Sequence, residues 1–205
     1  MELLTLALVA VVVLQFFKAR ERRERVALLG GFLRRYQIEK LMENLTDGYL
    51  RALGEADAQR SAQIWAILAD TEKNLRTQFQ SFAADFARVP AQEARVSTLA
   101  LALPYARRWL PGKSFDMRRL LQVHAQGLAA AVTPEAPETP NERKRRAYTM
   151  TAEIYLMQHS CHWFCRSATV ASVRLLGQHH TSYEQVLNAV SPATRAAYGQ
   201  VVNRL

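Results

Sequence analysis

The first seventeen residues constrain the fold of this chain most strongly, because nearly all of them are apolar. The stretch Leu3–Phe17 reads LLTLALVAVVVLQFF, and only Thr5 and Gln15 interrupt it. A helix over Met1–Phe17 is about 25 Å long at the usual rise per residue, slightly less than the hydrocarbon core of a bilayer, about 30 Å. Long basic side chains at the helix end and local bilayer thinning make up the difference. We therefore expect residues 1–17 to form one membrane-spanning helix.

Two alternatives compete with this interpretation, a cleaved signal peptide and a helix buried in a larger assembly. A secretory signal carries its positive charges before the apolar stretch and has small residues before the cleavage site. Here the basic cluster follows the apolar stretch, and Val13-Leu14-Gln15 is not a site of the A-x-A type. The sequence favours an uncleaved, single-pass signal anchor over both alternatives.

A basic juxtamembrane segment, residues 18–30, comes directly after the apolar stretch and begins KARERRER. Lysines and arginines that flank a membrane span lie on its cytoplasmic side. The chain should therefore have its N-terminus outside and its folded part in the cytoplasm, at a bacterial inner membrane. Anionic lipid headgroups are the expected contact of these side chains. The basic residues concerned are Lys18, Arg20, Arg22, Arg23 and Arg25.

The overall charge is strongly positive, with a formal net charge of +9, but much of it lies beside the apolar stretch. Residues 18–35 contain seven basic and two acidic residues. Because a membrane-facing position accounts for this excess, the charge argues against nucleic-acid binding.

A second basic run opens a predicted helix, where cations oppose the helix dipole. The run is a candidate contact for a polyanion, a protein partner or the acidic linker beside it, although a solvated basic face is the simpler interpretation. Its residues are Arg143, Lys144, Arg145 and Arg146.

The remainder of the chain has the apolar spacing of helices. No segment alternates at period two, and 8 glycines occur in 205 residues. The clearest pattern steps by three and four residues and predicts an amphipathic helix of about thirty residues that ends at Pro90 and pairs with the helix before it. Its apolar stripe consists of Ile64, Leu68, Thr71, Leu75, Phe79, Phe82, Phe86 and Val89.

Further helices are expected over 93–103, from Ser114 to 128 and over 148–176. The last is apolar almost all round and should lie at the centre of a bundle. Two short helices then finish the chain, one opened by a capping box at Thr181-x-x-Glu184 and one by Ser191-Pro192.

The predicted fold class is all-α, with an N-terminal membrane-spanning helix followed by a soluble bundle of about six to seven helices. A bend is expected at Gly30-Gly31. The expected organisation is a transmembrane anchor over 1–17, the basic segment over 18–30, bundle parts over 31–132 and 143–205, and a Pro/Glu-rich linker over 133–142. The two bundle parts are expected to form one domain.

One cluster contains residues with metal or redox chemistry, within His159–Cys165 (HSCHWFC). Cys161, His162 and Cys165 share helix faces at spacings of three and four, which suits chelation of a zinc ion. A second ligand pair would have to come from His124 or from His179-His180. The C-x3-C spacing is not the redox C-x-x-C motif, and buried cysteines commonly behave as small apolar residues. Core packing, a metal site and a redox-sensing thiol pair all remain as interpretations.

Common catalytic signatures are missing from the sequence: there is no Walker loop, no G-x-G-x-x-G and no G-x-S-x-G. We therefore expect a non-enzymatic, membrane-anchored interaction module, such as a scaffold, an assembly factor or a regulatory subunit. It should dock a protein partner, or a second copy of itself, through helix faces. The alternatives are a metal-binding or redox-sensing bundle and a polyanion-binding protein at the membrane surface.

Overall fold

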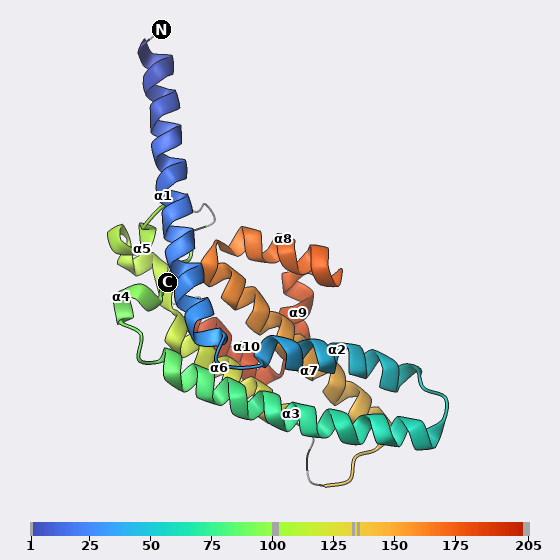
Figure 1. The fold of residues 1–205 in the computed structure, drawn as a ribbon. Coiled ribbons are helices and arrows are strands. Elements are labelled where there is room, and N and C mark those ends of the chain that lie inside the picture. Colours follow the sequence, from blue (N-terminus) through green and yellow to red (C-terminus); the bar gives the residue numbers. More distant parts are fainter. Residues whose placement is uncertain (1, 100–102, 133, 135, 203–205) are drawn as a thin grey trace.

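The computed structural model describes residues 2–99, 103–132, 134 and 136–202. One long helix, α1 (Glu2–Leu33), projects from a helical bundle formed by the rest of the chain (Figure 1). The fold is all-α, as predicted, apart from a short pair of strands. By length and composition α1 is suited to cross a membrane, and its most apolar window is 0% buried within the protein.

The two halves of α1 have different surroundings. The apolar half is exposed, whereas the lower half packs on the bundle and buries Arg25 and Leu29. The predicted bend at Gly30-Gly31 is wrong, since α1 continues through both glycines to Leu33. Leu29 on one side of the glycines and Phe32 on the other pack in the core, and these contacts hold the turn helical although each glycine costs about 1 kcal/mol.

Helices α2 (Ile38–Gly54) and α3 (Ala58–Phe86) lie side by side as an antiparallel hairpin. The side chain of Asp57 caps α3 by accepting a hydrogen bond from the backbone N–H of Arg60. The predicted stripe of α3 faces the core, with Leu75, Phe79, Phe82 and Phe86 each 0% exposed.

The predicted helix over 93–103 is wrong. A single turn, α4 (Ala91–Ala94), leads into strand β1 (Arg95–Ser97), which pairs antiparallel with β2 (Ser114–Asp116). Val96 lies opposite Phe115, and both side chains are buried, so the tertiary pairing overrides the local helical spacing. Residues 100–102 of that prediction lie outside the described residues. The short helices α5 (Ala106–Trp109) and η1 (Pro111–Lys113) separate the strands.

Helix α6 (Met117–Ala130) follows β2 directly. Ser114, expected to cap this helix, belongs to β2, and Asp116 is the cap, accepting from the N–H of Arg118. Helix α7 (Pro140–Cys165) begins inside the predicted linker, with a capping box between Thr139 and Glu142. Residues 133 and 135 of that linker lie outside the described residues.

The single helix predicted over 148–176 is in fact two helices, because α7 ends at Cys165 and α8 (Ala168–His179) starts after Ser167. In a continuing helix the carbonyl oxygen of Phe164 would accept from the N–H of Ala168. That oxygen instead accepts a hydrogen bond of 2.6 Å from Arg25 Nη1, and the Ser167 hydroxyl caps the new helix by accepting from Val170 N–H.

Two short helices complete the described chain, α9 (Tyr183–Ala189) and α10 (Pro192–Val202). The capping box of α9 lies one residue later than predicted, between Ser182 and Gln185. Ser191 caps α10 as predicted, accepting from the N–H of Thr194 at 3.0 Å. Buried residues from both sides of 133–142 belong to one apolar cluster, which includes Phe86 and Phe164 in ring contact.

Candidate functional site

The most informative site lies where α1 joins the bundle, and Arg25 is at its centre. The Arg25 guanidinium donates to the carbonyl oxygens of Phe164 at 2.6 Å and Arg95 at 2.9 Å. It also pairs with the Glu21 carboxylate at 3.3 Å and lies 4.9 Å from the centroid of the Phe164 ring. The expectation that Arg25 contacts lipid headgroups is therefore corrected: the residue is 7% exposed, and its guanidinium bonds to backbone carbonyl groups of the bundle.

A second connection joins α1 to the bundle above Arg25. Glu21 Oε2 accepts a hydrogen bond from the backbone N–H of Tyr105 at 2.7 Å. The Tyr105 ring lies edge-on to the ring of Phe17, with centroids 6.4 Å apart. Tyr105 has a left-handed backbone, with φ of 54°, which costs a non-glycine residue about 1–2 kcal/mol. The connections at Arg25 and Glu21 together hold α1 in one direction relative to the bundle.

A cavity of about 260 Å³ lies beside these connections, between α1, β1, the segment before α5, and the break between α7 and α8. Its basic lining residues are Lys18, Arg22, Arg25 and Arg166, and Glu21 is the carboxylate among its lining residues. Apolar side chains complete the walls, among them Val96, Leu103, Trp163 and Val170. The cavity therefore combines a positive edge with apolar walls.

Exposed apolar side chains occur on α1, α5 and α8, the helices near the point where α1 leaves the bundle. Figure 1 shows α5 and α8 on either side of α1 at this level. Trp109 at the end of α5 is 80% exposed, and Val173 on α8 is 67% exposed. Large apolar groups exposed on one side of a protein indicate a contact with a membrane or a partner. The other exposed apolar residues here are Phe16, Phe17, Leu103, Val170 and Leu176.

The other predicted membrane-surface residues occupy two sides of α1. Lys18 and Arg22 line the cavity. Arg20 and Arg23 are exposed outside it, and Arg20 pairs with Glu24 at 3.0 Å.

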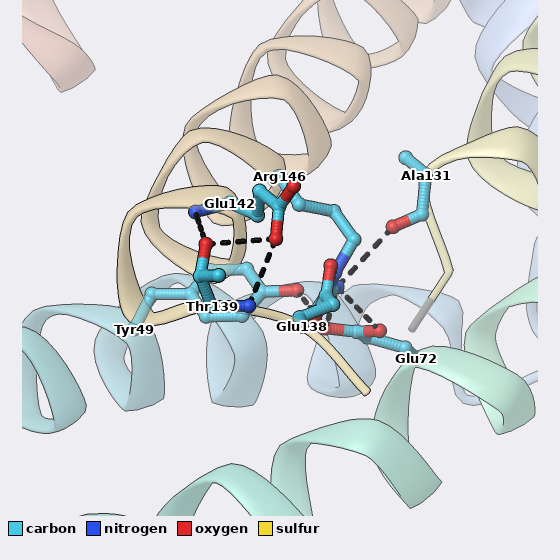
Figure 2. A network of polar contacts seen from close by, with 7 residues as sticks. All are labelled: Tyr49, Glu72, Ala131, Glu138, Thr139, Glu142 and Arg146. Atoms are coloured by element: carbon cyan, nitrogen blue, oxygen red, sulfur yellow. Dashed lines mark hydrogen bonds and ion pairs between the residues drawn. The ribbon is translucent and has the colours of Figure 1, made fainter. Parts of the chain in front are cut away.

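One residue of the basic run at the start of α7, Arg146, forms ion pairs inside the protein (Figure 2). Arg146 pairs with Glu72 at 2.8 Å and with Glu138 at 2.9 Å, and its side chain is 12% exposed. Glu72 is fully buried and also accepts from the Tyr49 hydroxyl at 2.6 Å. Arg146 therefore neutralises a buried carboxylate and is not available to a polyanion.

The other three residues of that run lie nearer the surface. The Arg143 guanidinium lies 5.6 Å from the centroid of the Trp65 ring. Lys144 and Arg145 are exposed. The four residues of the run therefore have different surroundings.

The Cys/His cluster lies in the packed part of α7. Within the described ranges, no three His, Cys, Asp or Glu side chains are placed to hold a metal ion. Burial raises the pKa of Cys161 far above its usual range, and burial raises the pKa of Cys165 to about 11. Burial lowers the pKa of His162 to about 4. Burial therefore disfavours the free thiolate at both cysteines, and the free thiolate is the form that redox chemistry of a thiol needs.

The residues considered as a second ligand pair lie elsewhere. His124 Nε2 is 2.9 Å from the Ser160 hydroxyl, and His179 Nε2 is 3.1 Å from Gln158 Oε1. His180 caps the C-terminus of α8 in a left-handed conformation. None of the three lies with Cys161, His162 and Cys165 in a candidate metal site of the described chain.

The sequence did not predict that two histidines and a glutamate would be buried in the bundle. His124, His159 and Glu153 are each at most 1% exposed, so they are closed to a substrate. Burial lowers the pKa of His124 to about 3 and of His159 to about 4, while burial raises the pKa of Glu153. These shifts all favour neutral side chains and indicate a structural role.

Sequence reasoning missed the residues that the bundle contributes to the junction cavity, chiefly Trp163, Arg166 and Val170. A signal was present, since Arg166-Ser167 places a charge and a good N-cap residue inside an apolar run. The carbonyl groups that hold Arg25 had no such signal, because any residue supplies one.

Comparison of the chain with protein-family models, with curated proteins and with solved structures found no match.

Proposed function

We propose that this protein is a non-enzymatic, membrane-anchored interaction module whose helical bundle lies on the cytoplasmic face of a bacterial inner membrane. The observation that carries the proposal is the pair of hydrogen bonds from Arg25 to the carbonyl oxygens of Phe164 and Arg95. They attach the lower half of an apolar helix to the folded bundle. A rigid attachment of this kind presents the bundle in one orientation.

Continuity of α1 supports an anchor over a cleaved signal. Phe17 and Lys18 lie in the middle of one helix, whose later residue Leu29 is buried in the core. A removable signal has no need of such a connection. The basic residues after the apolar half, including Lys18 and Arg22, support the cytoplasmic placement of the bundle.

The α2–α3 hairpin is the proposed docking surface for a protein partner or a second copy. It extends sideways from the end of α1 (Figure 1). Leu50 and Ile67 on this hairpin are 72% and 67% exposed. Exposed aliphatic side chains on helices are typical anchors for a partner helix.

Membrane fractionation of the full chain tests the anchor. We expect the protein to remain with membranes after carbonate washing and its intact mass to include residues 2–17. A Val9→Arg/Val13→Arg variant should move to the soluble fraction, since each arginine near the middle of a span costs about 2.5–3.5 kcal/mol. Recovery of soluble wild-type chain, or of a chain that lacks the apolar half of α1, would refute the proposal.

A matched variant tests the docking surface separately. Leu50→Arg/Ile67→Arg introduces the same number of arginines on the hairpin. It should stay in the membrane fraction but lose the proteins, or the second copy, that chemical cross-linking captures with the wild-type chain. Unchanged cross-linking would remove the hairpin as the docking surface. Protection of the bundle from protease added outside intact spheroplasts checks the orientation.

A further inference from the structure

The cavity at the junction of α1 and the bundle brings basic side chains of α1 and of the α7–α8 break together beside apolar walls. Lys18 and Arg22 come from α1, and Arg166 comes from the break between α7 and α8. Among the described residues, the side chains of these three form no hydrogen bond or ion pair. Three cations from segments far apart in sequence therefore surround one space without a protein partner.

The carboxylate in the cavity does not cancel this charge. Glu21 pairs with Arg25 and accepts the backbone N–H of Tyr105. Its charge is thus already matched inside the protein. The remaining potential of the cavity is positive and suits a phosphate group, which arginine binds through its planar set of N–H donors.

The position of the cavity along α1 identifies the source of that phosphate. The lining begins at Gln15, in the last turns of the apolar half, and continues through Lys18 to Arg22 in the basic segment. The cavity therefore lies at the level where an anchored α1 would pass from hydrocarbon to headgroups. Exposed apolar side chains on both sides, Leu103 and Val170, line the same space.

The size of the cavity is also informative. Sites that enclose a whole small ligand measure about 300–1,000 Å³, whereas this one measures about 260 Å³ and is open to the outside. The cavity has room for the polar end of a larger amphiphile, whose apolar remainder would lie against an apolar surface outside it. The exposed apolar half of α1 provides that surface directly above Gln15.

We propose that this cavity binds one anionic phospholipid, with its phosphate between Arg22 and Arg166 and its acyl chains along the apolar half of α1. The inference rests on the proposed membrane anchoring and adds a specific lipid to it. A bound lipid would bridge α1 to the α7–α8 break beside the contacts that Arg25 makes. The lipid would thereby help to fix the tilt of the bundle on the membrane.

Native mass spectrometry of the full chain in detergent, with phosphatidylglycerol added, tests this site. The wild-type protein should retain one phosphatidylglycerol per chain, and phosphatidylcholine at the same concentration should be retained at least tenfold less. An Arg22→Gln/Arg166→Gln variant should lose at least tenfold in phosphatidylglycerol retention. Both side chains are exposed and have no ion pair among the described residues, so the variant should fold.

The matched control is Arg20→Gln/Arg23→Gln, which removes the same number of charges, both from α1 and both outside the cavity. It should retain phosphatidylglycerol like the wild type. An equal loss of phosphatidylglycerol retention in both variants would indicate general attraction to a basic surface and would overturn the proposal. Unchanged retention in both variants would overturn it as well. Displacement of the lipid by glycerol 3-phosphate alone would identify a site for a soluble phosphate ester instead.

The measurement is independent of anchoring in cells. If the chain binds phosphatidylglycerol in detergent but does not fractionate with membranes, the proposed function fails while the lipid site stands. If it fractionates with membranes but shows no selective retention, the anchor stands and the lipid site fails.

Discussion

Arg25 Nη1 and the carbonyl oxygen of Phe164 lie 2.6 Å apart, and this hydrogen bond joins the projecting helix to the end of α7. The bond lies at the break between α7 and α8, because the oxygen that accepts it is the one that a continuing helix would pair with Ala168 N–H. One buried arginine thus connects α1 to the end of α7 and to β1.

Replacement of Arg25 should destabilise the protein through this contact. Arg25→Gln removes a charged donor from two backbone carbonyls and leaves Glu21 without its ion pair, so we expect the free energy of unfolding to fall by about 2–4 kcal/mol. Urea denaturation of the full chain in detergent measures the change. Arg23→Gln, an exposed neighbour on α1, is the control and should stay within about 0.5 kcal/mol of the wild type. Equal effects of the two substitutions would contradict the structural role of Arg25.

Loss of the ion pair between Arg146 and Glu72 should destabilise the protein more than loss of the Arg25 contacts. Arg146→Met leaves a carboxylate with 0% exposure without its cation, which costs about 3–5 kcal/mol. Arg145→Met, one residue earlier and exposed, should change stability by about 0.5 kcal/mol or less.

A double-mutant cycle separates the lost pair from lost packing. Glu72→Gln removes the buried charge, so the double variant Glu72→Gln/Arg146→Met should be more stable than Arg146→Met alone. Additive losses would show that the pair does not interact energetically.

The buried histidines should make the protein sensitive to mild acid. The folded pKa values of His124 and His159, about 3 and about 4, lie below the unfolded value of about 6.5. The unfolded state therefore binds protons first as the pH falls below about 6.5, and stability decreases until the folded values are reached. At pH 5 each histidine should reduce the free energy of unfolding by about 2 kcal/mol relative to neutral pH.

The free energy of unfolding, measured between pH 7.5 and pH 5, tests this effect by how steeply it falls as the pH is lowered. The pKa of His162 is also lowered to about 4, so His159→Gln should reduce the pH dependence by about a third of the contribution of the three histidines, whatever its effect at neutral pH. His180→Gln, at an exposed position, should leave the slope unchanged. A His159→Gln variant with the wild-type slope would refute the assignment.

Two glycine-to-alanine substitutions should have opposite signs. A Cβ at Gly127 would collide with the Glu153 carboxylate and would lie 2.5 Å from the Thr194 hydroxyl, so Gly127→Ala should destabilise by about 1–3 kcal/mol. A Cβ at Gly177, within α8, meets nothing within 4 Å, so Gly177→Ala should stabilise by about 0.5–1 kcal/mol. Thermal unfolding of the two variants distinguishes the cases, and the same sign for both would contradict the close packing of α6 on α7 and α10.

Local pattern predicted the elements wherever one face of a helix is buried over many turns. The stripe from Leu68 to Phe86 is such a case, because its spacing of three and four follows directly from burial against neighbouring helices. Prediction failed where a long-range contact competes with the local pattern. Val96 has a helical neighbourhood in sequence but pairs with Phe115 in β2, and no local signal contains that partner.

The candidate site shows the same division. Lys18 and Arg22 could be selected from sequence because they follow an apolar stretch. Arg25 could be selected too, but its burial could not, since its partners are backbone carbonyls that any residue provides. Arg166 joins Arg22 at the cavity only because α7 ends beside α1.

The sequence by itself therefore determined the all-α class, the apolar half of α1 and the charge that follows it, since composition and periodicity are local properties. The tertiary structure alone decided that α1 is attached to the bundle through Arg25, that Arg146 neutralises Glu72, and that Arg166 shares one cavity with the basic residues of α1. Each of these depends on residues brought together across the fold, whose pairing no local spacing records.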